Sequence, residues 1–117
     1  VDTPPGLGDE HLDLLTHINK RVEALIVTTP SPLSLRAVNR LVEVLLDGGY
    51  RILGVIGNMD DDDTVRKYCE NRSYRFLGSI PFIPDLDKAI GDIDKLKNTR
   101  LWTVINDVVD KINSTVY

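Results

Sequence analysis

The feature of this sequence that most restricts its fold is the alternation of short apolar runs with longer amphipathic segments. Residues 22–27, 50–57 and 74–80 are short runs with several apolar side chains, and Pro, Gly or polar residues bound them. Such runs are typical of buried strands. The segments between them repeat apolar residues every three or four positions, as amphipathic helices do. Strands that alternate with helices of this length predict an α/β fold, a parallel sheet with flanking helices and right-handed connections.

The second and last helices have the clearest signals. Ser31 and Pro32 predict a helix start, with Ser as N-cap and Pro at the first helical position, and Gly48 with Gly49 predicts its end. The apolar stripe of this helix is Leu35, Val38, Leu41, Val42, Leu45 and Leu46. The last helix begins at Asn98 or Thr99, and its expected buried face is Leu101, Val104, Ile105, Val108, Val109 and Ile112. Shorter helices are expected at residues 9–21 and from the aspartates at 60–63 to about Asn71, with a helical turn at 85–90.

Composition narrows the functional classes. The 117 residues are enough for one domain, and 42% hydrophobic residues suffice for a core. A net charge of −4 argues against a nucleic-acid partner, which usually requires a basic surface. The single cysteine, Cys69, forms no internal disulfide, so a reducing cytoplasm is the expected location. The absence of a signal peptide, a long apolar span or a lipidation motif predicts no membrane association.

The first residues, Asp-Thr-Pro-Pro-Gly-Leu-Gly-Asp, have the pattern of a strand end, a tight turn and a helix start. Backbone amides at such a helix start attract phosphate. The Asp2 carboxylate is a suitable ligand for hydrated Mg²⁺, which needs only one or two protein oxygens. Gly6 lacks a Cβ atom, so a ligand can approach its backbone closely. Asp9 suits the N-cap of the helix that follows.

This string closely resembles the Walker B and switch II segment of the Mrp/MinD family of P-loop ATPases. The resemblance continues through Thr28-Thr29-Pro30 and Gly54-Val55-Ile56-Gly57-Asn58-Met59. It implies a P-loop NTPase (Rossmann-like) fold, with ATP and Mg²⁺ as cofactors. By resemblance, Asp2 orders the water shell of Mg²⁺ and the Gly6 amide meets the γ-phosphate. Asp9 either positions the attacking water or only caps its helix.

The phosphate-binding loop of that family is absent from the sequence. No Gly-x-x-x-x-Gly-Lys-Ser/Thr motif or variant occurs, and only Val1 precedes Asp2. Residues 1–117 are therefore expected to form the carboxyl-terminal part of one nucleotide-binding domain, with an incomplete sheet. The resemblance places the missing phosphate-loop strand between the Asp2 strand and the strand at 22–27. The expected partners are the missing amino-terminal part and a second copy in an ATP-dependent homodimer.

Two further segments are candidates for the site that holds the base. Asn58 and Met59 follow the strand at 50–57, and by resemblance the asparagine amide reads the adenine edge. Pro81, Phe82 and Ile83 follow the next strand and, by resemblance, line the flat face of the base. The alternatives are a turn asparagine at 58 and a rigid surface turn at 81–84, with Phe82 in the core.

The remaining motifs have simpler interpretations. The aspartates at 60–63 are expected to be a solvated helix start in preference to a metal site, and Cys69 an ordinary helix cysteine. Mrp-like iron–sulfur carriers use a Cys-x-x-Cys pair after the Asn-Met segment, and this chain departs from that pattern. A MinD-like membrane anchor is basic, whereas the last helix has Asp107 and Asp110 against Lys111.

These observations predict part of an ATP-binding, ATP-hydrolysing switch ATPase in iron–sulfur or metallocentre assembly, which acts on a client metalloprotein. The alternatives are a nucleotide-independent interaction module, a MinD-like positioning ATPase, and a cluster carrier despite the missing cysteine pair. Without a phosphate loop, the 117 residues alone are expected not to hydrolyse ATP.

Overall fold

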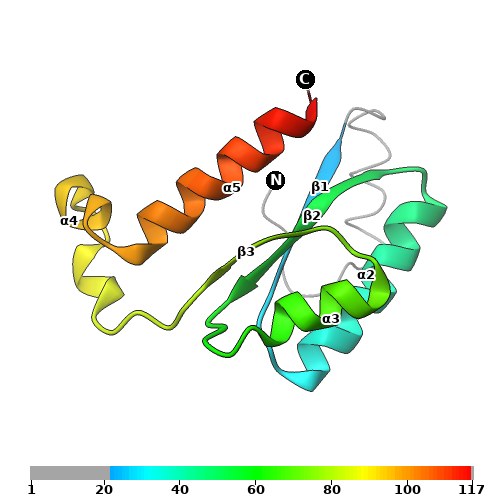
Figure 1. The fold of residues 1–117 in the computed structure, drawn as a ribbon, viewed down its shortest axis with the longest axis horizontal. Helices are drawn as coiled ribbons and strands as arrows, with labels where there is room; N and C mark the ends of the chain where they lie inside the picture. Colours follow the sequence, from blue (N-terminus) through cyan, green and yellow to red (C-terminus); the bar gives the residue numbers. More distant parts are fainter. Residues whose placement is uncertain (1–21, 117) are drawn as a thin grey trace.

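A computed structural model describes residues 22–116, in which a three-stranded parallel sheet is the central element (Figure 1). Its strands are β1 (Glu23–Thr28), β2 (Arg51–Asn58) and β3 (Phe76–Ile80), in the order β1-β2-β3. Each strand lies within two residues of its predicted bounds. The predicted parallel α/β sheet with flanking helices is confirmed, and it is consistent with an incomplete P-loop NTPase fold.

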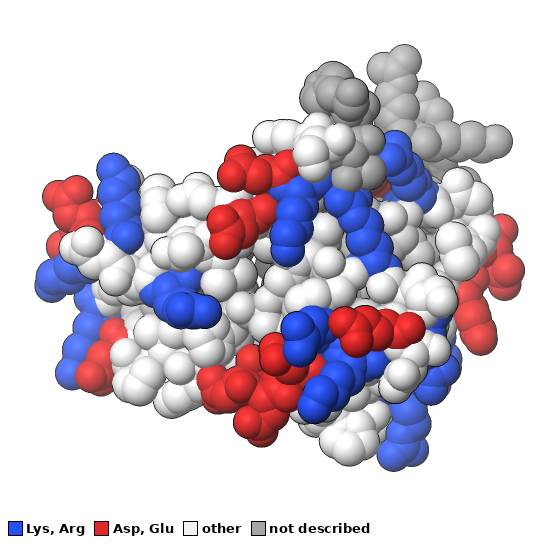
Figure 2. Space-filling model, viewed as in Figure 1, with Lys and Arg blue, Asp and Glu red and all other residues white. Residues whose placement is uncertain are grey.

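Helices cover both faces of this sheet. Helices α2 (Pro32–Asp47) and α3 (Thr64–Arg72) lie on one face, and α5 (Arg100–Val116) lies on the other (Figure 1). The connection from β3 to α5 contains the 3₁₀ helix η1 (Leu86–Ala89) and the short helix α4 (Ile93–Lys97). The sequence patterns did not predict α4. Among residues 22–116, no helix combines the length and apolar character that crossing a membrane requires. On the face of the molecule that Figure 2 shows, acidic and basic side chains are interspersed.

Helix α2 begins and ends as its sequence predicts. The Ser31 hydroxyl accepts a hydrogen bond from the Ser34 amide, and Pro32 occupies the first turn, where a missing N–H costs nothing. After Asp47, Gly49 adopts a φ of 79°, which glycine tolerates without strain. This turn lets the Tyr50 amide donate to the Leu45 carbonyl and directs the chain into β2.

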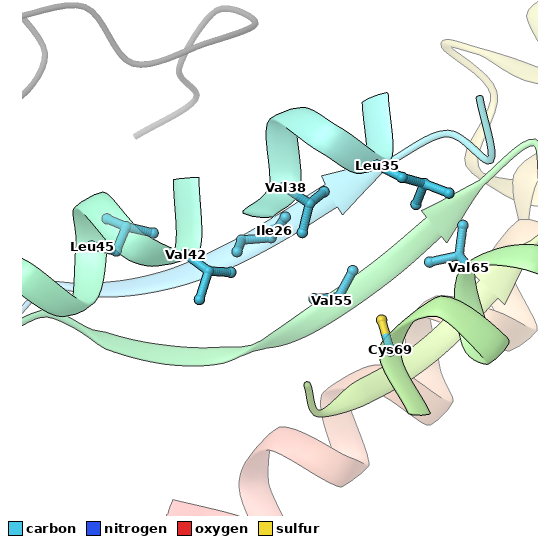
Figure 3. Close-up of a cluster of buried hydrophobic side chains, with 8 residues drawn as sticks. All are labelled: Ile26, Leu35, Val38, Val42, Leu45, Val55, Val65 and Cys69. Atoms are coloured by element: carbon cyan, nitrogen blue, oxygen red, sulfur yellow. The ribbon is translucent and has the colours of Figure 1, made fainter. Parts of the chain in front are cut away.

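The main core lies between the sheet and helices α2 and α3 (Figure 3). It contains buried side chains from strands β1 and β2 and from helices α2 and α3, namely Ile26, Leu35, Val38, Val42, Leu45, Val55, Val65 and Cys69. The expected stripe of α2 is correct except at Leu46, which is 59% exposed. Helix α2 packs only one face against the sheet, and Leu46 lies outside that face.

A smaller core forms under α5, where Val108 packs with Ile56 and Leu77. The prediction that Ile105 and Val109 belong to the buried face of α5 is wrong, because they are 40% and 47% exposed. Among the described elements, α5 packs mainly against β3, so only one side of its apolar stripe is covered.

Among residues 22–116, other elements cover only one face of strand β1. Ile26 and Thr28 are buried toward α2, whereas Leu25 and Val27 on the opposite face are 43% and 58% exposed. The expectation of a fully buried strand is therefore wrong for this face. Within residues 22–116, β1 pairs with β2 alone, so its other edge has no partner strand among them.

Candidate functional site

The carboxyl ends of β2 and β3 meet at one edge of the sheet, because the two strands are parallel. Strand β2 ends at Asn58 and β3 ends at Ile80, and the two residues are register partners. Ligands of open α/β sheets bind at this edge. The loop after β2 and the loop after β3 lie side by side here.

A pocket of about 300 Å³ lies between these two loops. Its volume is at the lower end of the range for small-molecule sites. The structure brings all five predicted base-site residues together in its lining, which consists of Asn58, Met59, Ile80, Pro81, Phe82, Ile83, Asp85, Leu86 and Asp87. Two segments 22 residues apart in the sequence thus meet in one concave surface.

The lining is mainly apolar, with an amide at one side and carboxylates at the rim. Phe82 is 60% exposed, so the alternative that placed it in the core is wrong. Asn58 is half-buried and offers both a donor and an acceptor. The described residues of the lining include no lysine or arginine, and Asp85 and Asp87 add negative charge. Such a surface suits a flat, uncharged ring better than a phosphate group.

Met59 follows Asn58 in a left-handed backbone conformation, with a φ of 53°. A residue with a side chain adopts this conformation only when its surroundings hold it there, and such residues are concentrated at functional sites and turns. Here it turns the chain sharply out of β2 and directs it toward the aspartate run.

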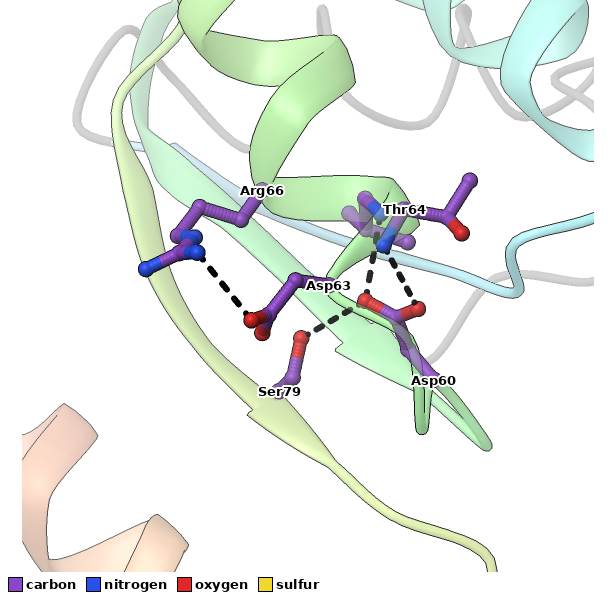
Figure 4. Close-up of polar contacts among 6 residues, drawn as sticks. Asp60, Asp63, Thr64, Arg66 and Ser79 are labelled. Carbon is purple, nitrogen blue, oxygen red and sulfur yellow. Dashed lines mark hydrogen bonds and ion pairs between the residues drawn. The ribbon is translucent and has the colours of Figure 1, made fainter.

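The aspartate run is not uniformly solvated, which corrects the sequence prediction. Asp60 is only 4% exposed, and its carboxylate accepts hydrogen bonds from the Thr64 and Val65 amides, both at 3.1 Å (Figure 4). The Ser79 hydroxyl donates a third, at 2.9 Å. Asp60 therefore caps the start of α3 and binds the end of β3, so its carboxylate is committed to structural contacts.

Gly57 makes room for this arrangement. A Cβ atom at position 57 would lie 2.7 Å from Ser79 Oγ and 3.1 Å from Asp60 Oδ2. The first distance is too short for a real contact, so a larger residue would displace the hydroxyl that Asp60 binds. The glycine of the Gly-Asn-Met segment thus supports the site through packing.

The other aspartates have separate contacts. Asp61 Oδ1 accepts a hydrogen bond from the Phe82 amide at 3.0 Å, and Asp63 forms an exposed ion pair with Arg66, also at 3.0 Å (Figure 4). The bonds from Ser79 to Asp60 and from Phe82 to Asp61 could not be predicted from the sequence, because the partners lie about 20 residues apart. Only the polar run directly before a helix could have suggested a cap.

Cys69 lies on α3 and is fully buried, as an ordinary core cysteine would be. Burial, with a smaller effect from the Glu70 charge, raises the pKa of its thiol above the usual value of 9.0. Thiolate is the form that binds metal, so this thiol is poorly suited to iron. Within residues 22–116, no group of three or more His, Cys, Asp or Glu side chains could hold a metal ion.

The remaining predicted site residues, Asp2, Gly6 and Asp9, lie outside the described residues. Their assigned contacts with Mg²⁺ and phosphate stay predictions.

Comparison with known proteins identifies the family to which the chain belongs. Residues 1–116 match the ParA family, described as "NUBPL iron-transfer P-loop NTPase". Relatives include the cytosolic Fe-S cluster assembly factor NBP35 of Eremothecium gossypii, 29% identical over 99% of this chain and 41% of the relative. The cytosolic Fe-S cluster assembly factor NUBP2 of Bos taurus is 27% identical over 97% of this chain and 49% of the relative.

The chain thus spans less than half the length of these curated relatives. The family match covers the predicted switch II string as well as the described sheet and pocket. On this evidence the chain belongs to the ParA-type family of NUBPL iron-transfer P-loop NTPases, and with it to the Mrp/MinD-type P-loop ATPases.

Proposed function

We propose that this chain is the base-binding part of an ATP-dependent switch ATPase that serves iron–sulfur cluster assembly. The observation that carries the proposal is the pocket at the carboxyl edge of the sheet. Its apolar walls and the Asn58 amide suit adenine, and it lies where the family fold binds ligands. ATP and Mg²⁺ are the cofactors that we assign to the complete site.

The other parts of the nucleotide would be bound elsewhere. We assign the Mg²⁺ water shell to Asp2, the γ-phosphate contact to the Gly6 amide, and either water positioning or helix capping to Asp9. A bound Mg²⁺ would supply electrostatic stabilisation of the transferring phosphoryl group. The carboxylates Asp85 and Asp87 at the pocket rim favour this division, because they would repel phosphate.

A missing amino-terminal part would supply the phosphate loop. Two features of the molecule support this partner, besides the greater length of the relatives. The outer edge of β1 has no partner strand within residues 22–116 and can accept one, and the exposed Leu25 and Val27 offer an apolar surface to a helix. With that part in place, residues 1–117 would complete a single nucleotide-binding domain, and two copies would form the ATP-dependent homodimer.

The cargo would be transferred to a client metalloprotein in the cytosol, the location that the relatives' names give for those proteins. The single cysteine of this chain is buried, so we do not assign it to the cluster. Anaerobic reconstitution with iron and sulfide, followed by absorption spectroscopy, tests this point. Cluster absorbance that disappears in Cys69→Ala would contradict it.

The experiment that tests the main proposal is calorimetry of ADP binding, with the full gene product that contains these 117 residues. Asn58→Ala should weaken ADP binding about ten-fold, the effect of one lost hydrogen bond in a desolvated site. Asn71→Ala, on the exposed surface of α3, is the matched control and should bind as the wild type. Equal affinities of the two variants would remove Asn58 from the site.

Failure of the wild-type gene product to bind ADP would favour the alternative, a nucleotide-independent interaction module. Residues 1–117 alone should show no Mg²⁺-dependent ATP turnover, because a lysine-bearing phosphate loop is absent from their sequence. Turnover by this chain alone would refute the division of the site between two parts.

A further inference from the structure

The two loops that form the pocket are joined by a hydrogen bond between Asp61 and Phe82. The β2–α3 loop, residues 59–63, contributes Met59 to the pocket, and the β3–η1 loop, residues 81–85, contributes Phe82. Asp61 Oδ1 accepts the Phe82 amide proton at an N···O distance of 3.0 Å. Asp61 thus contacts the backbone of the residue whose ring is the most exposed apolar part of the pocket wall.

The start of the β3–η1 loop has few amide protons with which to fix its backbone. Its first four residues are Pro81, Phe82, Ile83 and Pro84, and the two prolines have no amide proton. Only Phe82 and Ile83 can donate from this stretch. The Asp60 amide donates to the Ile80 carbonyl at 3.0 Å, which ties the two loops together at their base. The Phe82 amide donates to Asp61 beyond that point, so this bond joins the loops where their side chains line the pocket.

The neighbouring aspartates do not perform this task. Asp60 accepts hydrogen bonds from the start of α3 and from the Ser79 hydroxyl, and Asp63 forms an ion pair with Arg66. Asp62 is exposed, and the described part of the chain gives it no hydrogen bond or ion pair. Asp61 is the member of the run that reaches across to the second loop.

We propose that Asp61 is a positioning residue for the nucleotide base: its carboxylate holds the Phe82 amide and thereby sets the apolar loop at the spacing that a flat ring requires. The inference rests on the proposed function, since it assumes that the pocket takes the base. Asp61 itself would touch neither base nor phosphate. Removal of the Asp61 carboxylate should let the β3–η1 loop move away from Asn58. Binding of the base should then weaken, whereas binding of the phosphates should stay the same.

The hydrogen bond itself can be tested in the nucleotide-free gene product by amide exchange followed with NMR. Asp61→Ala should accelerate exchange of the Phe82 amide about five-fold or more, because its acceptor is lost. Asp62→Ala removes the same charge one residue away and should leave that amide unchanged. Equal exchange in the two variants would overturn the inference without touching the proposed function.

The role in base binding is tested by calorimetry with two probes, ADP and inorganic tripolyphosphate. Asp61→Ala should bind ADP about five-fold more weakly than Asp62→Ala, with tripolyphosphate affinity equal in both. Asp61→Asn keeps a side-chain oxygen as acceptor and should restore ADP affinity to within about two-fold of wild type.

Each other result has a definite meaning. Equal ADP affinities of Asp61→Ala and Asp62→Ala, or an equal loss for both probes, would overturn the positioning role while leaving the proposed function in place. An Asp61→Asn variant as weak as Asp61→Ala would exclude the hydrogen bond as the cause. A wild type that binds no ADP would overturn both proposals together.

Discussion

Replacement of Asp60 by Ala should destabilise the beginning of α3 more than any other change in the aspartate run. The Asp60 carboxylate satisfies two backbone amides of the first helical turn and accepts the Ser79 hydroxyl, in a position that is 4% exposed. Loss of a helix cap costs about 1–2 kcal/mol. Loss of a hydrogen bond to a charged acceptor costs about 1–2 kcal/mol more.

The sum of about 2–4 kcal/mol corresponds to roughly 30- to 1,000-fold faster local opening. Hydrogen exchange of peptides that cover α3, followed by mass spectrometry on the full gene product, measures this directly. Asp62→Ala is the control for charge, since Asp62 is exposed, and it should change exchange less than two-fold.

Ser79→Ala separates the two contributions, because it removes one partner of Asp60 and leaves both helix amides bonded. It should accelerate exchange of α3 about five-fold. The double variant should then show less than the product of the two single effects, since both remove the same Ser79–Asp60 bond. Exchange in Asp60→Ala equal to that in Asp62→Ala would refute the assignment of Asp60 as the cap of α3.

Three further changes test other parts of the structure. Leu45→Ala should lower the free energy of unfolding in urea by about 2–5 kcal/mol, because Leu45 is 4% exposed. Leu46→Ala, at a 59% exposed position, should lower it by about 0.5 kcal/mol or less, and equal losses would refute the packing of α2. Gly57→Ala should destabilise the protein, because its Cβ would lie 2.7 Å from Ser79 Oγ, and Ser79→Ala in the same chain should recover part of the loss. The free energy of unfolding should fall as pH rises above 9.0, because the Cys69 thiol loses its proton at lower pH in the unfolded chain than in the folded chain. Urea unfolding at several pH values measures this fall, which should be smaller in Cys69→Ala. The same pH profile in wild type and Cys69→Ala would contradict the prediction.

The sequence predicted the elements of this fold better than their exposed faces. Strand and helix order followed from local patterns, and the start of α2 followed from Ser31 and Pro32. The buried faces were predicted too wide, since an apolar stripe does not reveal how much of it another element covers. Ile105 and Val109 are exposed because α5 packs mainly on β3, which is a matter of tertiary arrangement.

The candidate site shows the same limit. The resemblance pointed to Asn58, Met59, Pro81, Phe82 and Ile83, and the parallel sheet explains why these five meet in one pocket, while their role in binding a base stays a prediction. The bonds that join Asp60 to Ser79 and Asp61 to Phe82 could not be predicted, because the donors and acceptors lie about 20 residues apart. Four identical side chains in a row gave no basis for distinguishing a cap, a loop contact, a solvated residue and an ion pair.

The uncovered side of β1 has a consequence for handling the protein. As far as residues 22–116 show, the outer edge of β1 presents unpaired backbone groups beside the apolar side chains Leu25 and Val27. A strand of this kind is a template for intermolecular strand addition. Preparations of these 117 residues alone are therefore expected to self-associate as their concentration rises, through backbone pairing between copies. A lysine at position 27 should suppress that aggregation, since charged side chains on an edge strand oppose such pairing.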